Sequence, residues 1–285
     1  MDAAARQIME AVRTADRDRY VSALYAPEDK RNSLFALYAF NAEIAAIRDR
    51  IHEPLPGEIR LQWWRDALAA QDGSGEGHPV AAALLTAIRD HALPLEAFEN
   101  YLDARIFDLY DDPMPSRGDL EGYCGETASV VIQMAALILD RDAAPAHAEA
   151  AGHAGCAQAI AGLLRMLPLH RARGQCYVPR DVLAAAGTTP EQFVGDASGE
   201  AAPRAVAAMA ALAREHLAMF ERHAASLPAP LRPAFLPVAP VGAYLARLAR
   251  DPAAALRGPV GQSAWRRHWT MFRVASRGWP ASSLT

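Results

Sequence analysis

The sequence predicts an all-α protein, and two observations lead to this fold class. Hydrophobic residues make up 52% of the 285 residues, with many Ala and Leu and few β-branched residues outside short runs. This composition favours packed helices over a sheet. Apolar residues also recur at helical spacing in nearly every long segment, for example at Leu34, Leu37 and Tyr38. No repeat or linker divides the chain, so we expect one helical domain over residues 1–285.

Helical periodicity, interrupted by Pro and Gly, sets the order of the predicted elements. The predicted helices span residues 29–51, 58–70, 79–92, 95–111, 117–140, 146–172 and 203–225, with two more after the Pro-rich segment 228–240. Pro54, Pro56 and Gly57 end the first helix, and the Gly-rich run 72–79 predicts a flexible loop. Beyond Pro179 the chain is less regular until residue 203. Helix follows helix through short joins, as in a bundle.

Charge and targeting features exclude several classes of function. The net charge of −4 is spread without strong blocks, so the chain lacks the basic face that a nucleic-acid partner requires. An acid at Asp2 and the absence of an apolar centre argue against a signal peptide, so we expect a cytoplasmic protein. No run approaches the ~18–20 apolar residues that span a bilayer. The sequence therefore predicts a soluble or peripheral protein.

The cysteines and the paired histidines of the 203–225 helix do not have metal-site spacing. Cys124, Cys156 and Cys176 are odd in number and far apart, which is typical of reduced core thiols. His216 and His223 lie seven residues apart on a charged helix, without the i, i+4 spacing of a metal site. We interpret these two histidines as part of a solvated face.

Five groups of residues occur in a characteristic order along the chain. They are Ala36–Phe40, preceded by Asp18-Arg19-Tyr20 and Lys30-Arg31; Trp63-Trp64-Arg65; Asp108-Leu109-Tyr110; Tyr123-Cys124 with Ala128-Ser129-Val130; and Gly174-x-x-Tyr177-Val178-Pro179. In order and spacing they resemble the squalene/phytoene synthase family, over most of a core at about 15–250. The resemblance implies the isoprenoid-synthase fold, a bundle of antiparallel helices around a central, largely apolar cavity.

The resemblance also shows which family acids this chain lacks. Family enzymes bind prenyl diphosphates through Mg²⁺ held by two aspartate motifs, whose carboxylates lie four residues apart on one helical face. The first motif falls on residues 45–49, where Asp49 is the remaining acid and Arg48 precedes it. The two acids of the second motif fall on Met166 and His170. Pro168 removes a backbone donor between them and predicts a bend in the helix.

With four of five motif carboxylates missing, we expect no bound cofactor. Under the enzyme alternative, Mg²⁺ would need substitute ligands, and the candidates are Asp49, Asp108 and Asp112, with Asp103, Asp111 and Glu126 on neighbouring helices. The same alternative makes Asp49 and Asp108 the candidate catalytic residues.

A ligand site without metal is a further expectation. Arginine recognises phosphate with two hydrogen bonds, so Arg48 and Arg165 with His170 would hold an anionic or lipid-like ligand, or else form internal ion pairs. The resemblance adds Tyr20 and Tyr177 to these ligand-binding candidates. His170 also suits acid–base chemistry, but we favour a structural role for it.

The substituted string from Gly162 to His170 resembles one branch of the family, the mitochondrial assembly factors for respiratory complex I and their bacterial relatives. The resemblance implies a non-catalytic protein that binds a protein partner or a lipid-like or prenyl ligand, in complex I biogenesis. The alternative is an active prenyl transferase that joins prenyl diphosphates head to head through altered metal ligands.

The C-terminal segment 263–279 mixes arginines with large aromatic residues. This pattern is typical of a helix in a membrane interface, which would place the protein peripherally at the inner membrane. The other interpretation is a final amphipathic helix that closes the bundle, with its arginines extending into solvent.

Overall fold

The computed structural model describes residues 3–51, 53–70, 77–195, 199–258 and 261–279. The α-helices are α1 (Ala3–Ala15), α2 (Arg17–Leu24), α3 (Glu28–Ala45), α4 (Pro54–Ala70), α5 (Pro79–His91), α6 (Leu95–Ala104), α7 (Arg117–Cys124), α8 (Val130–Leu139), α9 (Ala148–Arg165), α10 (Leu167–Ala172), α11 (Arg180–Ala186), α12 (Pro190–Gly195), α13 (Ala201–Ala224), α14 (Arg232–Phe235), α15 (Val241–Arg250), α16 (Ala254–Arg257) and α17 (Ala264–Arg277). Short 3-10 turns are η1 (Arg48–Arg50), η2 (Arg105–Leu109), η4 (Ala144–His147), η5 (Ala229–Leu231) and η6 (Leu236–Val238), and η3 (Gly125–Ser129) is a π-helical turn. No strand occurs in these ranges, which confirms the all-α prediction.

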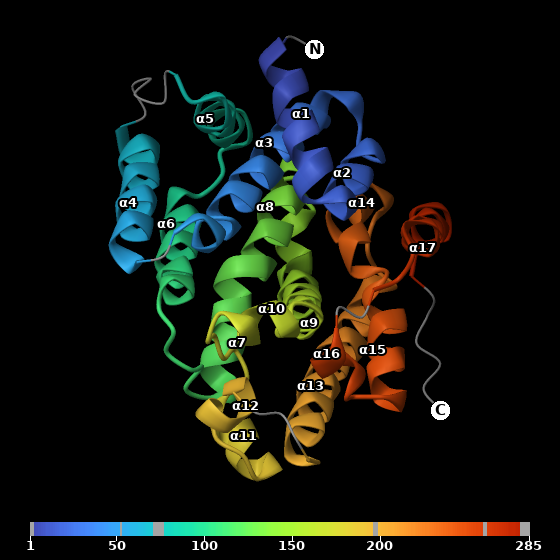
Figure 1. Ribbon diagram of the computed structural model, residues 1–285. Coiled ribbons are helices and arrows are strands. Elements are labelled where there is room, and N and C mark those ends of the chain that lie inside the picture. The colour runs from blue at the N-terminus through green and yellow to red at the C-terminus, as the bar shows by residue number, and fades with distance from the viewer. Residues whose placement is uncertain (1–2, 52, 71–76, 196–198, 259–260, 280–285) are drawn as a thin grey trace.

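The core of the bundle is built on α8 and α9. Figure 1 shows them at the centre, with α4, α5 and α6 on one side and α13, α15 and α17 on the other. Eight of the ten residues of α8 are buried, because its sequence is apolar on every side. Buried apolar residues from α1 to α17 join it in one contiguous cluster. Burial of this surface is the main source of stability for such a bundle.

Small residues allow α9 to approach its neighbours closely. Its buried positions are largely Ala, and Gly155 lies against Ser129 of η3, where a Cβ atom would overlap the Ser129 backbone. The Ser129 Oγ donates a hydrogen bond of 2.8 Å to the Gly152 carbonyl, so the two segments are also joined by a polar contact. This close approach positions the turn η3, which lines the cavity described below.

Helix boundaries differ from the prediction at functionally important places. The predicted helix 29–51 ends at Ala45, so Arg48 and Asp49 lie in the separate turn η1. The predicted helix 146–172 is interrupted after Arg165 and resumes at Leu167. This interruption confirms the bend expected at Pro168, which stands in the first turn of α10, where no backbone donor is needed.

Other elements were predicted incompletely. Helices α1 and α2 were not predicted; α1 packs on the bundle through Ile8 and Val12. The C-terminal region holds three helices rather than two, since the four-residue α16 is too short for a periodic pattern. Most of the loop predicted at 72–79 lies outside the described residues.

Among the described residues, one segment is long and apolar enough to cross a bilayer by length and composition. It runs from Arg117 to Leu139 through α7, η3 and α8, and 61% of its most apolar window is buried inside the bundle. A core helix of a bundle has the same length and composition. We therefore interpret it as the core helix that the packing of α8 indicates.

Candidate functional site

A cavity of about 650 Å³ opens between the ends of α3 and α9, η2, η3, α10 and α15. Alanines and other apolar side chains form part of its wall, and charged and uncharged polar side chains form the rest. The charged residues are Arg19, Arg48, Arg105, Arg165, Arg173, Arg267, Asp16, Asp18, Asp49 and Asp108. Cations outnumber acids in this part of the structure, so the cavity favours an anionic group.

Most of the site residues predicted from the sequence lie together on this cavity. Arg48, Asp49, Asp108, Arg165, His170 and Tyr177 all line it, although they come from five different segments. Tyr20 does not, because its ring stacks on Phe35 with 5.8 Å between centroids. Asp112 is exposed and does not line the cavity either. Their assignments to ligand binding and metal binding therefore have no support from the geometry.

Asp108 is the most buried acid of the cavity, with 8% of its surface exposed. Its Oδ1 atom accepts hydrogen bonds of 2.8 Å from the hydroxyls of Tyr123 and Tyr177. Its Oδ2 atom accepts a hydrogen bond of 2.9 Å from Nη1 of Arg105. Three donors thus occupy the carboxylate, and a charge-assisted bond to arginine is among the stronger kinds. The group is paired within the protein.

The partners of Asp108 are held in the protonation states that suit its negative charge. Burial, followed by the Asp108 charge, raises the pKa of the Tyr123 and Tyr177 hydroxyls well above the usual range. Both hydroxyls therefore remain protonated and donate to the carboxylate. The guanidinium of Arg105 also lies over the Tyr101 ring, 5.2 Å from its centroid, which adds a cation–π contact.

Asp49 and Arg48 are also engaged in ion pairs. The Asp49 carboxylate pairs with Arg173, which follows α10. Arg48 pairs with Asp111 at 2.8 Å. Because η1 lies beyond the end of α3, Asp49 no longer shares a helical face with the position four residues before it.

Arg165 and His170 lie on either side of the helix break and differ in their charge. Arg165, the last residue of α9, is exposed and lines the cavity; its guanidinium acts on the Asp18 carboxyl through charge, but its side chain forms no hydrogen bond or ion pair with another described residue. Burial lowers the pKa of His170 to about 4, so the imidazole is neutral at pH 7. Its ring lies 4.7 Å from that of Tyr177. Arg165 is thus a cation available to a ligand, and His170 is not.

Asp18 is a cavity residue that the sequence analysis quoted in a motif but did not select. Burial raises the pKa of its carboxyl, and Arg267 opposes this shift. Its Oδ2 atom lies 3.3 Å from Nη1 of Arg267, whereas Oδ1 is buried without a hydrogen-bond partner. No local signal identifies this pair, because Asp18 and Arg267 lie at opposite ends of the chain.

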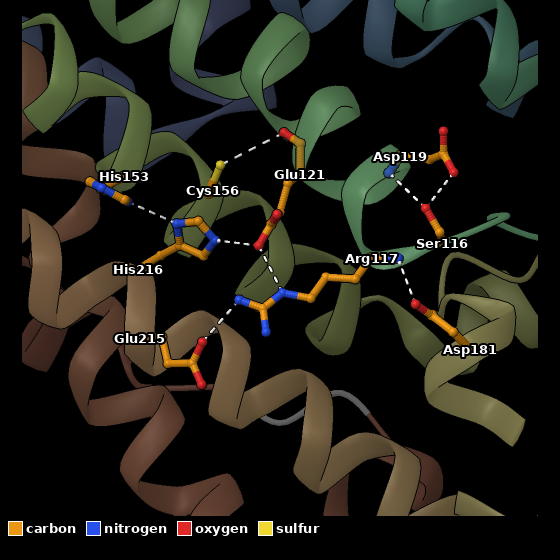
Figure 2. Close-up of polar contacts among 9 residues, drawn as sticks. All are labelled: Ser116, Arg117, Asp119, Glu121, His153, Cys156, Asp181, Glu215 and His216. Carbon is orange, nitrogen blue, oxygen red and sulfur yellow. Dashed lines mark hydrogen bonds and ion pairs between the residues drawn. The ribbon is translucent and has the colours of Figure 1, made fainter. Parts of the chain in front are cut away.

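The prediction of a solvated histidine face was wrong for His216. Figure 2 shows His216 of α13 between His153 of α9 and Glu121 of α7, outside the cavity. The two Nδ1 atoms of the histidines are 3.0 Å apart, and Nε2 of His216 lies 3.2 Å from Oε1 of Glu121. Burial and the neighbouring His216 lower the pKa of His153. These histidines join α9 to α13.

The three cysteines are buried and free, as expected for core thiols. Sγ of Cys156 lies 3.9 Å from the backbone carbonyl of Glu121, at the edge of the same group of residues (Figure 2).

The cavity residues do not fit Mg²⁺ in the way that the family motifs do. The metal needs oxygen ligands that are free to coordinate it. Asp108 is occupied by Arg105 and two tyrosines, and Asp49 is paired with Arg173. Within the ranges described, no group of three or more His, Cys, Asp or Glu residues is arranged to hold a metal ion.

Comparison with known proteins agrees with the fold and the motif pattern. The family model "Squalene/phytoene synthase" matches residues 12–273. The chain therefore belongs to the squalene/phytoene synthase family.

The relatives that the chain resembles include complex I assembly factors and prenyl synthases. The chain is 31% identical over 245 residues to "NADH dehydrogenase (ubiquinone) complex I, assembly factor 6" of Bos taurus, covering 85% of this chain and 73% of that protein. The human protein of the same name is 29% identical over 244 residues, with the same coverage. The presqualene diphosphate synthase of Sinorhizobium fredii is 28% identical over 204 residues, covering 70% of this chain and 71% of that protein.

Solved structures of the family share the fold. Squalene synthase HpnC of Alicyclobacillus acidocaldarius superimposes with a TM-score of 0.75 at 20% identity, over 90% of this chain and 95% of that one. A dehydrosqualene synthase in complex with a ligand gives a TM-score of 0.78 at 18% identity, over 96% and 95%. These similarities confirm the isoprenoid-synthase type of helical bundle.

Proposed function

We propose that this chain is a non-catalytic member of the squalene/phytoene synthase family that acts in the assembly of respiratory complex I. One observation carries the proposal: the acids that remain at the cavity are engaged in internal bonds. Asp108 is held by Arg105, Tyr123 and Tyr177, and Asp49 by Arg173. The names of the assembly-factor relatives support the biological role.

An assembly role requires a protein partner, and we propose that this partner is a complex I subunit or an assembly intermediate. Deletion of the gene in its host would then reduce the amount of assembled complex I, measured by native electrophoresis of membranes and by NADH oxidation. The wild-type gene and an Asp49→Asn variant would both restore it, because the role does not depend on catalysis. Normal complex I in the deletion strain, together with loss of an isoprenoid product, would contradict the proposal.

A second candidate function is the binding of an anionic, lipid-like ligand in the cavity without metal. Arg165 favours this function, because its side chain lines the cavity and forms no hydrogen bond or ion pair within the described part of the chain. The apolar part of the wall suits a hydrocarbon chain, as ligand cavities of this size do. A prenyl or other lipid phosphate combines an anionic group for Arg165 with a hydrocarbon chain for the apolar wall.

Binding of farnesyl monophosphate or inorganic pyrophosphate to the purified protein tests this candidate. We expect calorimetry to detect binding that is unchanged by chelation of Mg²⁺, and Arg165→Gln to weaken it about tenfold, since a charged hydrogen bond contributes ~1.5 kcal/mol or more. Arg60→Gln, an arginine on α4 outside the cavity, is the control. Equal affinity of Arg165→Gln and the wild type for the ligand would show that Arg165 does not contact it.

The catalytic alternative, a prenyl transferase with altered metal ligands, has less support, because Asp108 accepts hydrogen bonds from three donors and Asp49 is paired with Arg173. Residence in the cytoplasm, with peripheral contact at the inner membrane, remains part of the proposal.

A further inference from the structure

Helix α17 (Ala264–Arg277) carries the most exposed aromatic surface of the described residues. Trp265, Trp269 and Phe272 are 70%, 48% and 47% exposed. Their spacing of four and three residues places them on one face of the helix. The rings stack in sequence, with 5.7 Å between the centroids of Trp265 and Trp269 and 5.6 Å between those of Trp269 and Phe272. Solvent-exposed aromatic surface of this kind marks an interaction site.

The charge of α17 indicates what binds there. Between residues 264 and 277 the sequence holds four arginines and no Asp or Glu. Arg266, Arg273 and Arg277 are exposed beside the aromatic face. Lipid headgroups of the cytoplasmic leaflet are anionic, and cationic residues near such a surface are attracted to it. Aromatic side chains flanked by arginines are the pattern of a helix that lies in a membrane interface.

The opposite face of α17 fixes the helix to the bundle. Met271 and Val274 are buried, and Arg267 reaches inward to Asp18 at 3.3 Å. Helix α17 packs against α2 and η6, and Figure 1 shows it at the outer edge of the molecule. The aromatic face therefore points away from the core, where a flat surface can reach it.

Helix α4 provides a comparison that separates charge from exposure. Leu55, Ile59 and Trp63 are 64%, 62% and 39% exposed and lie four residues apart, so they also form one apolar stripe. The two arginines of α4 are balanced by two acids in the same helix, Glu58 and Asp66. The stripe on α4 thus lacks the excess of positive charge that anionic lipid would favour.

We propose that α17 docks this protein on an anionic lipid bilayer, with Trp265, Trp269 and Phe272 inserted at the headgroup level and Arg266, Arg273 and Arg277 bound to lipid phosphates. Because Arg267 of the same helix lines the cavity, docking places the cavity beside the membrane. The inference deepens the peripheral membrane contact of the proposed function and does not need the assembly role, since it is argued from α17 alone.

Co-sedimentation of the full chain with vesicles tests the inference. We expect binding to vesicles that contain phosphatidylglycerol, weak binding to pure phosphatidylcholine, and release at high salt. Replacing Arg266, Arg273 and Arg277 by Gln together should lower partitioning onto anionic vesicles by on the order of one hundredfold. Trp265→Ser, Trp269→Ser and Phe272→Ser together should abolish it. The matched control, Leu55→Ser, Ile59→Ser and Trp63→Ser, removes a similar exposed stripe and should leave partitioning unchanged.

A measurement on the unaltered protein accompanies these variants, so that a folding defect cannot decide the result. Lipids brominated near the headgroup should quench its tryptophan emission, and should do so equally in the α4 control. The inference is overturned if the wild-type protein does not sediment with anionic vesicles, or if the α17 variants sediment as well as the wild type. It is also overturned if the α4 control loses as much vesicle binding as the α17 variants. A concentration-dependent dimer that the α17 aromatic variant dissolves, without vesicle binding, would instead make this face a contact between copies.

Discussion

Asp108 has three hydrogen-bond donors on its carboxylate and is nearly inaccessible to solvent. Its sequence position marked it as a candidate metal ligand, yet its partners could not be foreseen. Tyr123 and Tyr177 were recognised only as motif residues, and Arg105 was not selected at all. The pairing of residues distant in sequence depends on how helices pack, and no local pattern records it. The sequence thus identified which residues line the cavity better than what they bind there.

Removal of the Asp108 charge should destabilise the protein strongly. Asp108→Asn leaves the buried Arg105 cation without its partner, and breaking such a pair costs about 3–5 kcal/mol. Urea unfolding measures this loss, with Asp112→Asn as control, since exposed substitutions usually change stability by about 0.5 kcal/mol or less. If Asp108→Asn and Asp112→Asn lowered the free energy of unfolding equally little, the pair of Asp108 with Arg105 would not stabilise the fold. The argument that this pair keeps Asp108 from a metal would then fail.

His170 should make the stability of the protein depend on pH. Burial lowers its pKa from 6.5 to about 4, so the unfolded chain takes up the proton first as the pH falls. Neutral His170 therefore leaves the folding free energy undiminished above pH 6.5. As the pH falls toward 4, protonation of the unfolded chain lowers the free energy of unfolding progressively, by up to ~3 kcal/mol.

Urea unfolding of the wild type and of His170→Asn across this pH range measures the difference, in which the effects of other acids cancel. The wild type should lose more stability than the variant as the pH falls. Parallel curves for the two proteins would show that His170 is freely protonated in the folded state.

At the scale of elements, the ends of helices decide what became of the two metal-binding motifs. Periodicity predicted that helices exist near residues 29–51 and 146–172, and Pro168 predicted the break in the second. The early end of α3 at Ala45 had no such signal, because the residues after it are compatible with helix. Consequently Asp49 lies in a turn and His170 follows a break, so neither motif retains two positions on one helical face.

The contact between α9 and the π-helical turn η3 is an element-scale feature that a single methyl group can test. Gly155→Ala places a Cβ atom against the Ser129 backbone, which cannot move aside as a flexible side chain can. We expect a loss of about 1–3 kcal/mol in the free energy of unfolding. Gly152→Ala, on the same helix with no atom within 4 Å of its new Cβ, should instead stabilise the protein by about 0.5–1 kcal/mol. Equal effects would mean that α9 and η3 do not pack this closely.

At the scale of the whole molecule, the chain keeps the family fold, and its cavity is lined by acids that are paired with arginines. Composition and periodicity indicated a helical bundle, and the motifs indicated the family, because both depend on buried residues that the fold requires. The replacement of free carboxylates by ion pairs was predicted only as one of two alternatives. The contacts of Asp49 with Arg173 and of Asp108 with Arg105 favour the ion pairs, and these contacts depend on helix packing that no local pattern records.

If this chain is a non-catalytic member of the family, its cavity does not support prenyl transfer with Mg²⁺. The decisive measurement is incubation of the purified chain with farnesyl diphosphate and Mg²⁺, beside an active squalene synthase. We expect neither a condensed product nor release of diphosphate above the level without protein. Formation of product that requires Mg²⁺ and is abolished by Asp49→Asn would contradict it.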